Sequence, residues 1–167
     1  MRDAFPDRTN DEFLQEVLNR INELRARHGS APLTLDAELV EYAKSRAAFA
    51  STYTGLSYNH ADLRSGTGEN ASWRGASSGP AAGSGTAAVN SWYAEIEKYD
   101  FAQGQGKNPG DVTGHFTALV WKNTTKLGVG RVAGQGPQWW ETYVVANFSP
   151  PGNVTGQYVM NVVPPTS

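Results

Sequence analysis

The spacing of apolar residues changes along this chain, and the change limits the folds that it can adopt. Helical spacing is seen in four segments, residues 9–29, 36–50, 86–99 and 115–122. From residue 127 onward the pattern becomes strand-like, with runs at 127–132 and 139–148 that are joined by a Gly- and Pro-containing turn at 134–137. Three or four helices around a small antiparallel sheet predict an α+β fold.

The helix ends carry their own signals. Thr9 and Glu12 have the spacing of a capping box, and Asp36 is a good N-cap for the second helix. Gly29 is the expected C-terminal cap of the first helix. His28 falls in the last turn of that helix, where a cation suits the helix dipole, and we assign it no functional role.

The segments between the helices are rich in small and polar residues. Residues 52–70 are expected to be mostly loop with a short strand, and the Gly-rich stretches 75–85 and 100–114 are expected to be mobile surface connections. Tryptophans are abundant, and we interpret four of them as core and sheet packing: Trp92, Trp121, Trp139 and Trp140.

Length and composition narrow the class of protein. The 167 residues suit one domain at 10–167, preceded by an N-terminal extension at 1–9. The net charge of -2 and the scattered Lys and Arg residues argue against nucleic acid as a partner and give no polybasic membrane patch. The absence of cysteine excludes disulfides and thiolate metal sites.

Signals for the cellular compartment are weak. Residues 1–10 contain no apolar leader segment, and no apolar run approaches a membrane span. Four Asn-X-Ser/Thr triplets hint at a eukaryotic secretory route, and they begin at Asn70, Asn123, Asn147 and Asn153. We prefer a structural interpretation for Asn70 and for the 147–153 segment, as a backbone-bonding residue and a turn.

Four separated motifs occur in a specific order. They are His60 with Gly68-Glu69-Asn70, then Trp92-Tyr-Ala-Glu95, then Gly114-His-Phe-Thr-Ala-Leu-Val-Trp121, and finally Asn147-Phe-Ser-Pro-Pro-Gly-Asn153. In this order the motifs resemble the CAP superfamily, which groups cysteine-rich secretory proteins, insect venom antigens and plant pathogenesis-related proteins. The resemblance covers roughly residues 10 to 160.

The resemblance implies a three-layer α-β-α sandwich, the SCP domain, with a small and mainly antiparallel central sheet. It also implies that one open cleft holds a tetrad of His60, Glu69, Glu95 and His115. Gly114 and Gly130 stand where relatives often have cysteines. The resemblance favours a secreted protein whose signal peptide has been removed, and a cysteine-free intracellular member is the alternative.

The tetrad residues have a definite coordination chemistry. Two neutral imidazoles, His60 and His115, can bind zinc or another divalent metal while the neighbouring carboxylates orient them. With two protein ligands the metal is expected to be weakly bound and not obligatory, and Asn70 is expected to support the site. Without a metal, a His beside a Glu can act as a general base. His60 as a solvated loop residue, His115 as a helix cap and Glu95 as an exposed charge are the ordinary alternatives.

Three functions follow as hypotheses. The first is a binding protein for a sterol or fatty acid, as the resemblance implies, with the loops 75–85 and 100–114 gating an apolar groove. The second is a module that contacts a membrane or protein surface, and the third is a zinc-dependent hydrolase or peptidase. No catalytic role is assigned to any single residue, and the chain is expected to be a monomer or a weak dimer.

Overall fold

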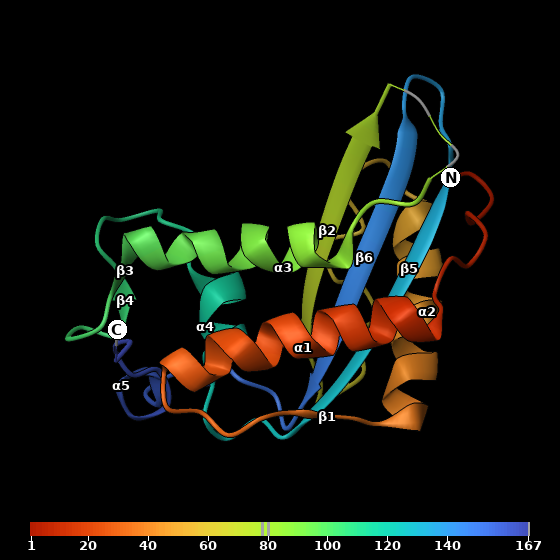
Figure 1. Cartoon of the computed structure of the whole chain (residues 1–167). Coiled ribbons are helices and arrows are strands. Elements are labelled where there is room, and N and C mark those ends of the chain that lie inside the picture. The colour runs from red at the N-terminus through yellow and green to blue at the C-terminus, as the bar shows by residue number, and fades with distance from the viewer. Residues whose placement is uncertain (78, 80, 167) are drawn as a thin grey trace.

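A four-stranded sheet forms the centre of the computed structural model, which describes residues 1–77, 79 and 81–166 (Figure 1). Its strands in spatial order are β1 (Thr34–Leu35), β5 (Lys126–Gln135), β6 (Trp140–Ser149) and β2 (Gly68–Ala76). Strand β1 runs parallel to β5, and the other neighbours are antiparallel. The α+β class and the mainly antiparallel sheet predicted from the sequence are thus confirmed.

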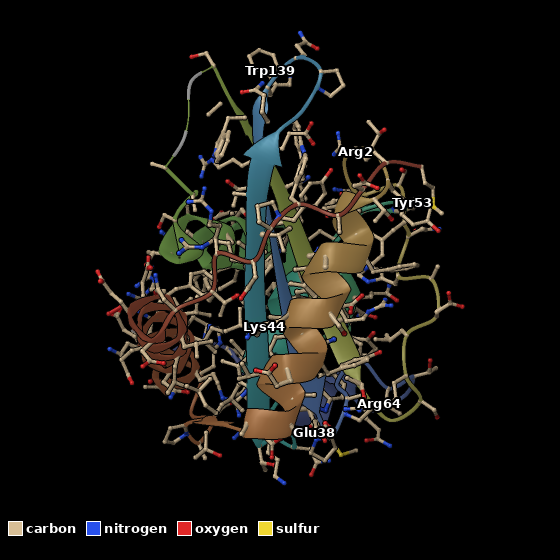
Figure 2. All side chains as sticks on the ribbon, turned by 90° about the vertical axis from the view of Figure 1, so that its right-hand side faces the viewer. Arg2, Glu38, Lys44, Tyr53, Arg64 and Trp139 are labelled. Atoms are coloured by element: carbon tan, nitrogen blue, oxygen red, sulfur yellow. The ribbon has the colours of Figure 1, made fainter. Side chains whose placement is uncertain are left out.

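Helices cover both faces of this sheet, which gives the three layers (Figure 1). One face carries three helices, α1 (Asp11–Arg27), α3 (Gly85–Tyr93) and α4 (Gly114–Val120). The other face carries α2 (Ala37–Ser51), which packs on β5 and β6 (Figure 2). Three smaller elements complete the chain: the 3-10 helix η1 (Ala94–Lys98), the two-strand ladder of β3 (Tyr99–Asp100) and β4 (Gln105–Gly106), and α5 (Tyr158–Asn161).

Helix caps explain where α1 and α2 begin. Asp36 accepts a hydrogen bond from the Leu39 N–H, as the sequence predicts. The predicted cap at Thr9 is wrong, because Asn10 accepts from the Phe13 N–H and caps α1 instead. The Thr9 hydroxyl accepts from the backbone N–H of Arg131, so it ties the chain to β5 before the helix starts.

Glycines let α2 approach the sheet closely. A Cβ atom on Gly128 would lie 2.2 Å from the carbonyl oxygen of Leu39, and one on Gly130 would lie 2.6 Å from the Cα of Lys44. The alanines on the facing side of α2, Ala43 and Ala47, are fully buried. Small residues on both partners therefore set this helix-to-sheet distance.

Two apolar clusters lie on the two sides of the sheet. The larger cluster fills the space under α1, α3 and α4 and includes Trp92 and Trp121, as predicted. The smaller one lies beneath α2. Trp139, for which core and sheet packing was predicted, is not in the core: its side chain stands at the tip of the β5–β6 hairpin, is 39% exposed and lies against Gly75 of β2 (Figure 2).

The loops also differ from the expectation in detail. Strand β2 continues through Ala76 into the predicted 75–85 connection, of which residues 78 and 80 lie outside the described part of the chain. The 100–114 loop is braced by the β3–β4 ladder. The predicted third helix ends as an α-helix at Tyr93 and continues as η1.

Among the described residues, no helix is both long and apolar enough to span a bilayer.

Candidate functional site

A small open cleft lies where the loop before β2 meets the start of α4. Its volume is about 170 Å³. Three of the four predicted tetrad residues line it together with the predicted supporting residue: His60, Glu69, His115 and Asn70. Glu95, the fourth tetrad residue, reaches the cleft through its contact with His115.

The His115 side of the cleft is held by a helix start. The Glu95 Oε1 atom accepts hydrogen bonds from the backbone N–H groups of His115 (2.9 Å) and Phe116 (3.1 Å), so this carboxylate caps α4. Its other oxygen, Oε2, lies 2.7 Å from His115 Nδ1. One carboxylate from η1 therefore fixes both the helix end and the orientation of the imidazole.

The His60 side is held by a buried carboxylate. His60 Nδ1 lies 2.8 Å from Oε1 of Glu69, which projects from the start of β2. The backbone of His60 has φ of 57°, in the left-handed region that non-glycine residues seldom occupy. Asn59 beside it is also left-handed, with φ of 54°. The turn therefore presents His60 in a backbone conformation that its surroundings must hold in place.

Glu69 is the most heavily bonded group of the site. Its side chain is fully buried and accepts hydrogen bonds from four side chains: Arg46, Tyr58, His60 and Asn147. Burial alone would raise the pKa of the Glu69 carboxyl, but these bonds, that from Arg46 first, outweigh it and lower the pKa to about 2. Burial beside Glu69 also raises the pKa of the Tyr58 hydroxyl well above its ordinary value.

Arg46 was not assigned to the site from the sequence. It bonds both oxygens of Glu69, at 2.7 and 2.9 Å, and donates to the Ala61 carbonyl oxygen that follows His60. The available signal was its position among Ala43, Ala47 and Ala50 on the buried side of α2, because an arginine on a buried face requires an anionic or carbonyl partner.

Two asparagines hold the start of α4 in place. The Asn70 Nδ2 group donates to the His115 carbonyl oxygen at 3.0 Å, so β2 is tied directly to the start of α4. Asn153, which the sequence analysis placed only in a turn, donates to the Gly114 carbonyl oxygen (2.9 Å) and accepts from the Thr117 hydroxyl (2.6 Å). The Asn70 bond therefore links the Glu69 side of the cleft to the His115 side, and the Asn153 bonds attach the 150–156 segment to α4.

The two His–Glu pairs share one chemical arrangement. A carboxylate accepts a hydrogen bond, so each Nδ1 atom carries the proton and the Nε2 atom of a neutral ring keeps its lone pair. Within the described residues, no hydrogen bond reaches Nε2 of His60 or of His115. Both atoms are thus available to a ligand or to a proton donor.

This donor set fits only an open metal site. No group of three or more His, Asp or Glu side chains in the described part of the chain is placed to hold a metal ion. Two imidazoles with carboxylates behind them match the ligands and outer partners of zinc, with the remaining positions left to solvent or to a ligand.

His28 is fully buried and does not act as the helix-end cation expected from the sequence. Its Nδ1 atom donates to the Val163 carbonyl oxygen at 2.7 Å, so Nε2 accepts from the Tyr93 hydroxyl at 2.8 Å. Burial lowers the pKa of the imidazole. His28 is therefore a neutral packing residue, and Gly29 behind it ends the helix with φ of 70°.

A larger cavity adjoins the cleft at Gly114. Its volume is about 490 Å³, and it lies between the 103–106 segment and α5. Glutamine, threonine and glycine residues line most of it, with Tyr158 and Val159 on the α5 side. Its lining contains no charged side chain, so the cavity differs from the cleft in chemistry.

Sequence similarity to known proteins extends over most of this chain. The Golgi-associated plant pathogenesis-related protein 1 of Homo sapiens is 39% identical over 92% of this chain and 94% of its own length. The secreted protein RBT4 of Candida albicans is 38% identical over 87% of this chain. This chain spans only 37% of RBT4, and 42% to 55% of three other fungal relatives.

Solved structures share the fold at lower sequence identity. BmVAL-1 superposes with a TM-score of 0.69 at 17% identity, over 98% of this chain and 88% of its own. NaASP2, solved with Zn2+, superposes with a TM-score of 0.65 at 23% identity, over 96% and 92%. A sequence model of the cysteine-rich secretory protein family, CAP, matches residues 18–148. With the family pattern, the relatives and the three-layer fold in agreement, this chain belongs to the CAP superfamily.

Proposed function

We propose that the cleft binds a divalent metal ion, reversibly, through the Nε2 atoms of His60 and His115. The observation that carries the proposal is the shared arrangement of the two rings, each with Nδ1 held by a carboxylate at 2.7–2.8 Å and both lining one cleft. A carboxylate on Nδ1 fixes the tautomer and makes Nε2 a more basic ligand.

The expected affinity is modest. Structural zinc sites have four protein ligands, whereas this cleft offers two, so the ion would keep open positions. A bound ion would supply a Lewis-acid centre there, and Glu69 and Glu95 would orient its ligands. The Zn2+ named with the structure of NaASP2 adds a comparison within the same fold.

Calorimetric titration of zinc into the metal-free protein tests this proposal. We expect saturation near one ion per chain, with the signal lost in His60→Ala and in His115→Ala. Glu95→Gln is expected to weaken binding about 10-fold or more, because it replaces the carboxylate behind His115. Glu97→Gln, an exposed change two residues away, is the matched control and should bind like the parent.

Equal heats from the parent and both histidine variants would reject the proposal. So would binding that survives His60→Ala at full strength, because a single imidazole would then account for it. Folding of each variant is checked by circular dichroism, since both histidine side chains are partly exposed and their loss should leave the fold intact.

A second candidate function is the binding of a lipid in the 490 Å³ cavity beside the cleft. Its size lies within the range of small-molecule sites, and the exposed Val159 on its rim gives an apolar contact. A sterol or a fatty acid is the ligand class proposed. Saturable retention of radiolabelled cholesterol or palmitate, reduced by Val159→Asp, would support it, and retention no greater than by an unrelated protein would reject it.

We also propose that the chain passes through the secretory pathway. The relatives include a secreted fungal protein and a Golgi-associated human one, and these names support the route. Immunolocalisation of the native protein in its own cells, in culture medium against cell extract, tests this. Recovery only from the soluble extract would favour the intracellular alternative.

A further inference from the structure

We propose that Asn123 is a site of N-linked glycosylation, and that the other three Asn-X-Ser/Thr triplets remain unmodified. All four triplets lie within the described residues, so the structure allows their side chains to be compared directly. The proposal concerns a chain that enters the endoplasmic reticulum, and its test supplies that route independently of the native one.

Asn70 and Asn147 are buried inside the sheet. The Asn70 side chain donates to the His115 carbonyl oxygen, and the residue is 2% exposed. Asn147 is 0% exposed, and its Nδ2 group donates to the Gly68 carbonyl oxygen and to Glu69 Oε2. A sugar on either nitrogen would have to occupy space that β2 and β6 fill, so a glycan there is incompatible with the fold.

Asn153 is half-buried in the wall of the cleft. Its Nδ2 group donates to the Gly114 carbonyl oxygen at 2.9 Å, while its Oδ1 accepts from Thr117 at 2.6 Å. Both ends of the amide are therefore engaged. A glycan on Nδ2 would have to pass through the small cleft that Asn153 lines, beside an amide held at both ends.

Asn123 differs from all three. It lies in the exposed turn between α4 and β5, where its backbone N–H donates to Asn161 Oδ1 at 3.1 Å. No hydrogen bond to its side-chain amide is found among the described residues. Thr125, the hydroxyl residue of the triplet, is also exposed, as are Lys122 and Lys126 on either side.

The chemistry of the modification balances with a lipid-linked oligosaccharide as the sugar donor. The amide nitrogen of Asn123 forms a bond to the first sugar carbon, and the bond from that carbon to the pyrophosphate of the lipid carrier breaks. The amide loses one proton to the transferase, and the lipid pyrophosphate leaves with the electron pair. The product keeps one amide N–H. At an exposed side chain, water can accept its hydrogen bond, so no buried acceptor is needed.

The turn position also separates the glycan from the cleft. Asn123 follows the C-terminal end of α4, whereas His115 stands at its N-terminal end. The seven-residue helix separates the two ends by about 10 Å at 1.5 Å per residue. A glycan at Asn123 should therefore leave zinc binding unchanged, which distinguishes this site from Asn153.

The test expresses the full chain in yeast behind a cleavable secretion leader. Intact-mass measurement before and after endoglycosidase treatment counts the glycans, and peptide mapping locates them. We expect one glycan, at Asn123. Thr125→Ala should abolish it and Thr125→Ser should retain it, because Ser preserves the triplet. Thr155→Ala removes the Asn153 triplet at a similarly exposed threonine and should leave the glycan count unchanged.

Two results would overturn the proposal. One is a secreted, folded chain without any glycan. The other is a glycan at Asn70, Asn147 or Asn153 in protein that unfolds cooperatively. The glycan count does not depend on zinc binding. A protein that binds no zinc could still carry the glycan at Asn123, so the two proposals are tested independently.

Discussion

Glu69 is a fully buried carboxylate that four side chains bond, and Arg46 contributes two of those bonds. Removing the arginine leaves a buried anion without its cation, so we expect Arg46→Met to lower the free energy of unfolding by about 3–5 kcal/mol. Urea denaturation at pH 7 measures this. Lys44→Met on the same helix is the control, because its pairs with Glu41 and Asp7 are at the surface and should cost under about 1 kcal/mol.

The pH dependence of the same pair has a definite sign. The folded-state pKa of Glu69 is lowered to about 2, below its value in the unfolded chain, so its contribution is fully present at neutral pH. That contribution disappears as the pH falls from about 4.5 toward 2. An Arg46→Met protein whose stability matched the parent at pH 7 would contradict the role given to this pair.

His28 should make stability depend on pH in a higher range. Burial lowers the folded-state pKa of the imidazole below its ordinary 6.5, so the unfolded chain binds the proton first as the pH falls. Stability should therefore be constant above about pH 7 and decline below 6.5. Comparing urea midpoints at pH 7.5 and 5.5 checks this, and His28→Gln should reduce the difference. A parent protein that gained stability at pH 5.5 would contradict the neutral, tautomer-fixed ring.

At the scale of elements, the packing of α2 on the sheet depends on the absence of side chains at two strand positions. Gly130→Ala places a Cβ 2.6 Å from the Lys44 Cα, so α2 must move, and we expect a loss of about 3 kcal/mol in unfolding free energy. Gly68→Ala is the control in β2, because its nearest contact would be an ordinary 3.6 Å. Thermal melting of both variants makes the comparison. Equal melting temperatures would show that α2 adjusts without cost.

Elements with one dominant periodicity were predicted well from the sequence. The apolar spacing of α1, the Asp36 cap and the β5–β6 hairpin all rest on interactions between residues close in the chain. The errors lie where distant contacts decide. Thr9 bonds to Arg131 instead of capping α1, and Trp139 at the hairpin tip stays 39% exposed.

In the site, too, local motifs were predictable from the sequence and contacts between distant residues were not. The family pattern brought His60, Glu69, Glu95 and His115 to attention, but the pairing of each ring with its own carboxylate depends on the tertiary fold. Arg46 lies 23 residues before Glu69, and no local pattern links them. His28 was predicted to suit the helix end as a cation, because the sequence does not show that the Val163 carbonyl oxygen, 135 residues later, bonds to its ring.

The N-terminal residues 1–9 lie beside β5 and contact the α2 side of the sheet rather than extending away from it. Arg2 bonds both oxygens of the buried Glu141 at 2.7 and 3.1 Å, and it also donates to the Ser51 carbonyl oxygen at the end of α2 (Figure 2). Asp7 forms a bridge to Val132 in β5.

Loss of the Arg2 contact should therefore weaken the fold globally. We expect Arg2→Ala to lower the free energy of unfolding by about 2–3 kcal/mol, since among the described residues Glu141 would keep its charge with only Trp73 and Tyr143 as donors. Chemical denaturation with a single fluorescence probe measures this, and Asp3→Ala, an exposed change in the same segment, is the control and should leave the midpoint unchanged. An unchanged midpoint for Arg2→Ala would mean that residues 1–9 add little to stability.

A shared metal site requires both cleft imidazoles to offer Nε2 to one metal ion. Long-range nitrogen–proton NMR of the three histidine rings during a zinc titration tests it directly, because it reports Nδ1 and Nε2 of each ring separately. We expect the Nε2 signals of His60 and His115 to shift together and saturate at the same zinc ratio, while both nitrogens of the buried His28 stay unchanged. A shift confined to one cleft ring, or no shift in either ring, would contradict a shared metal site.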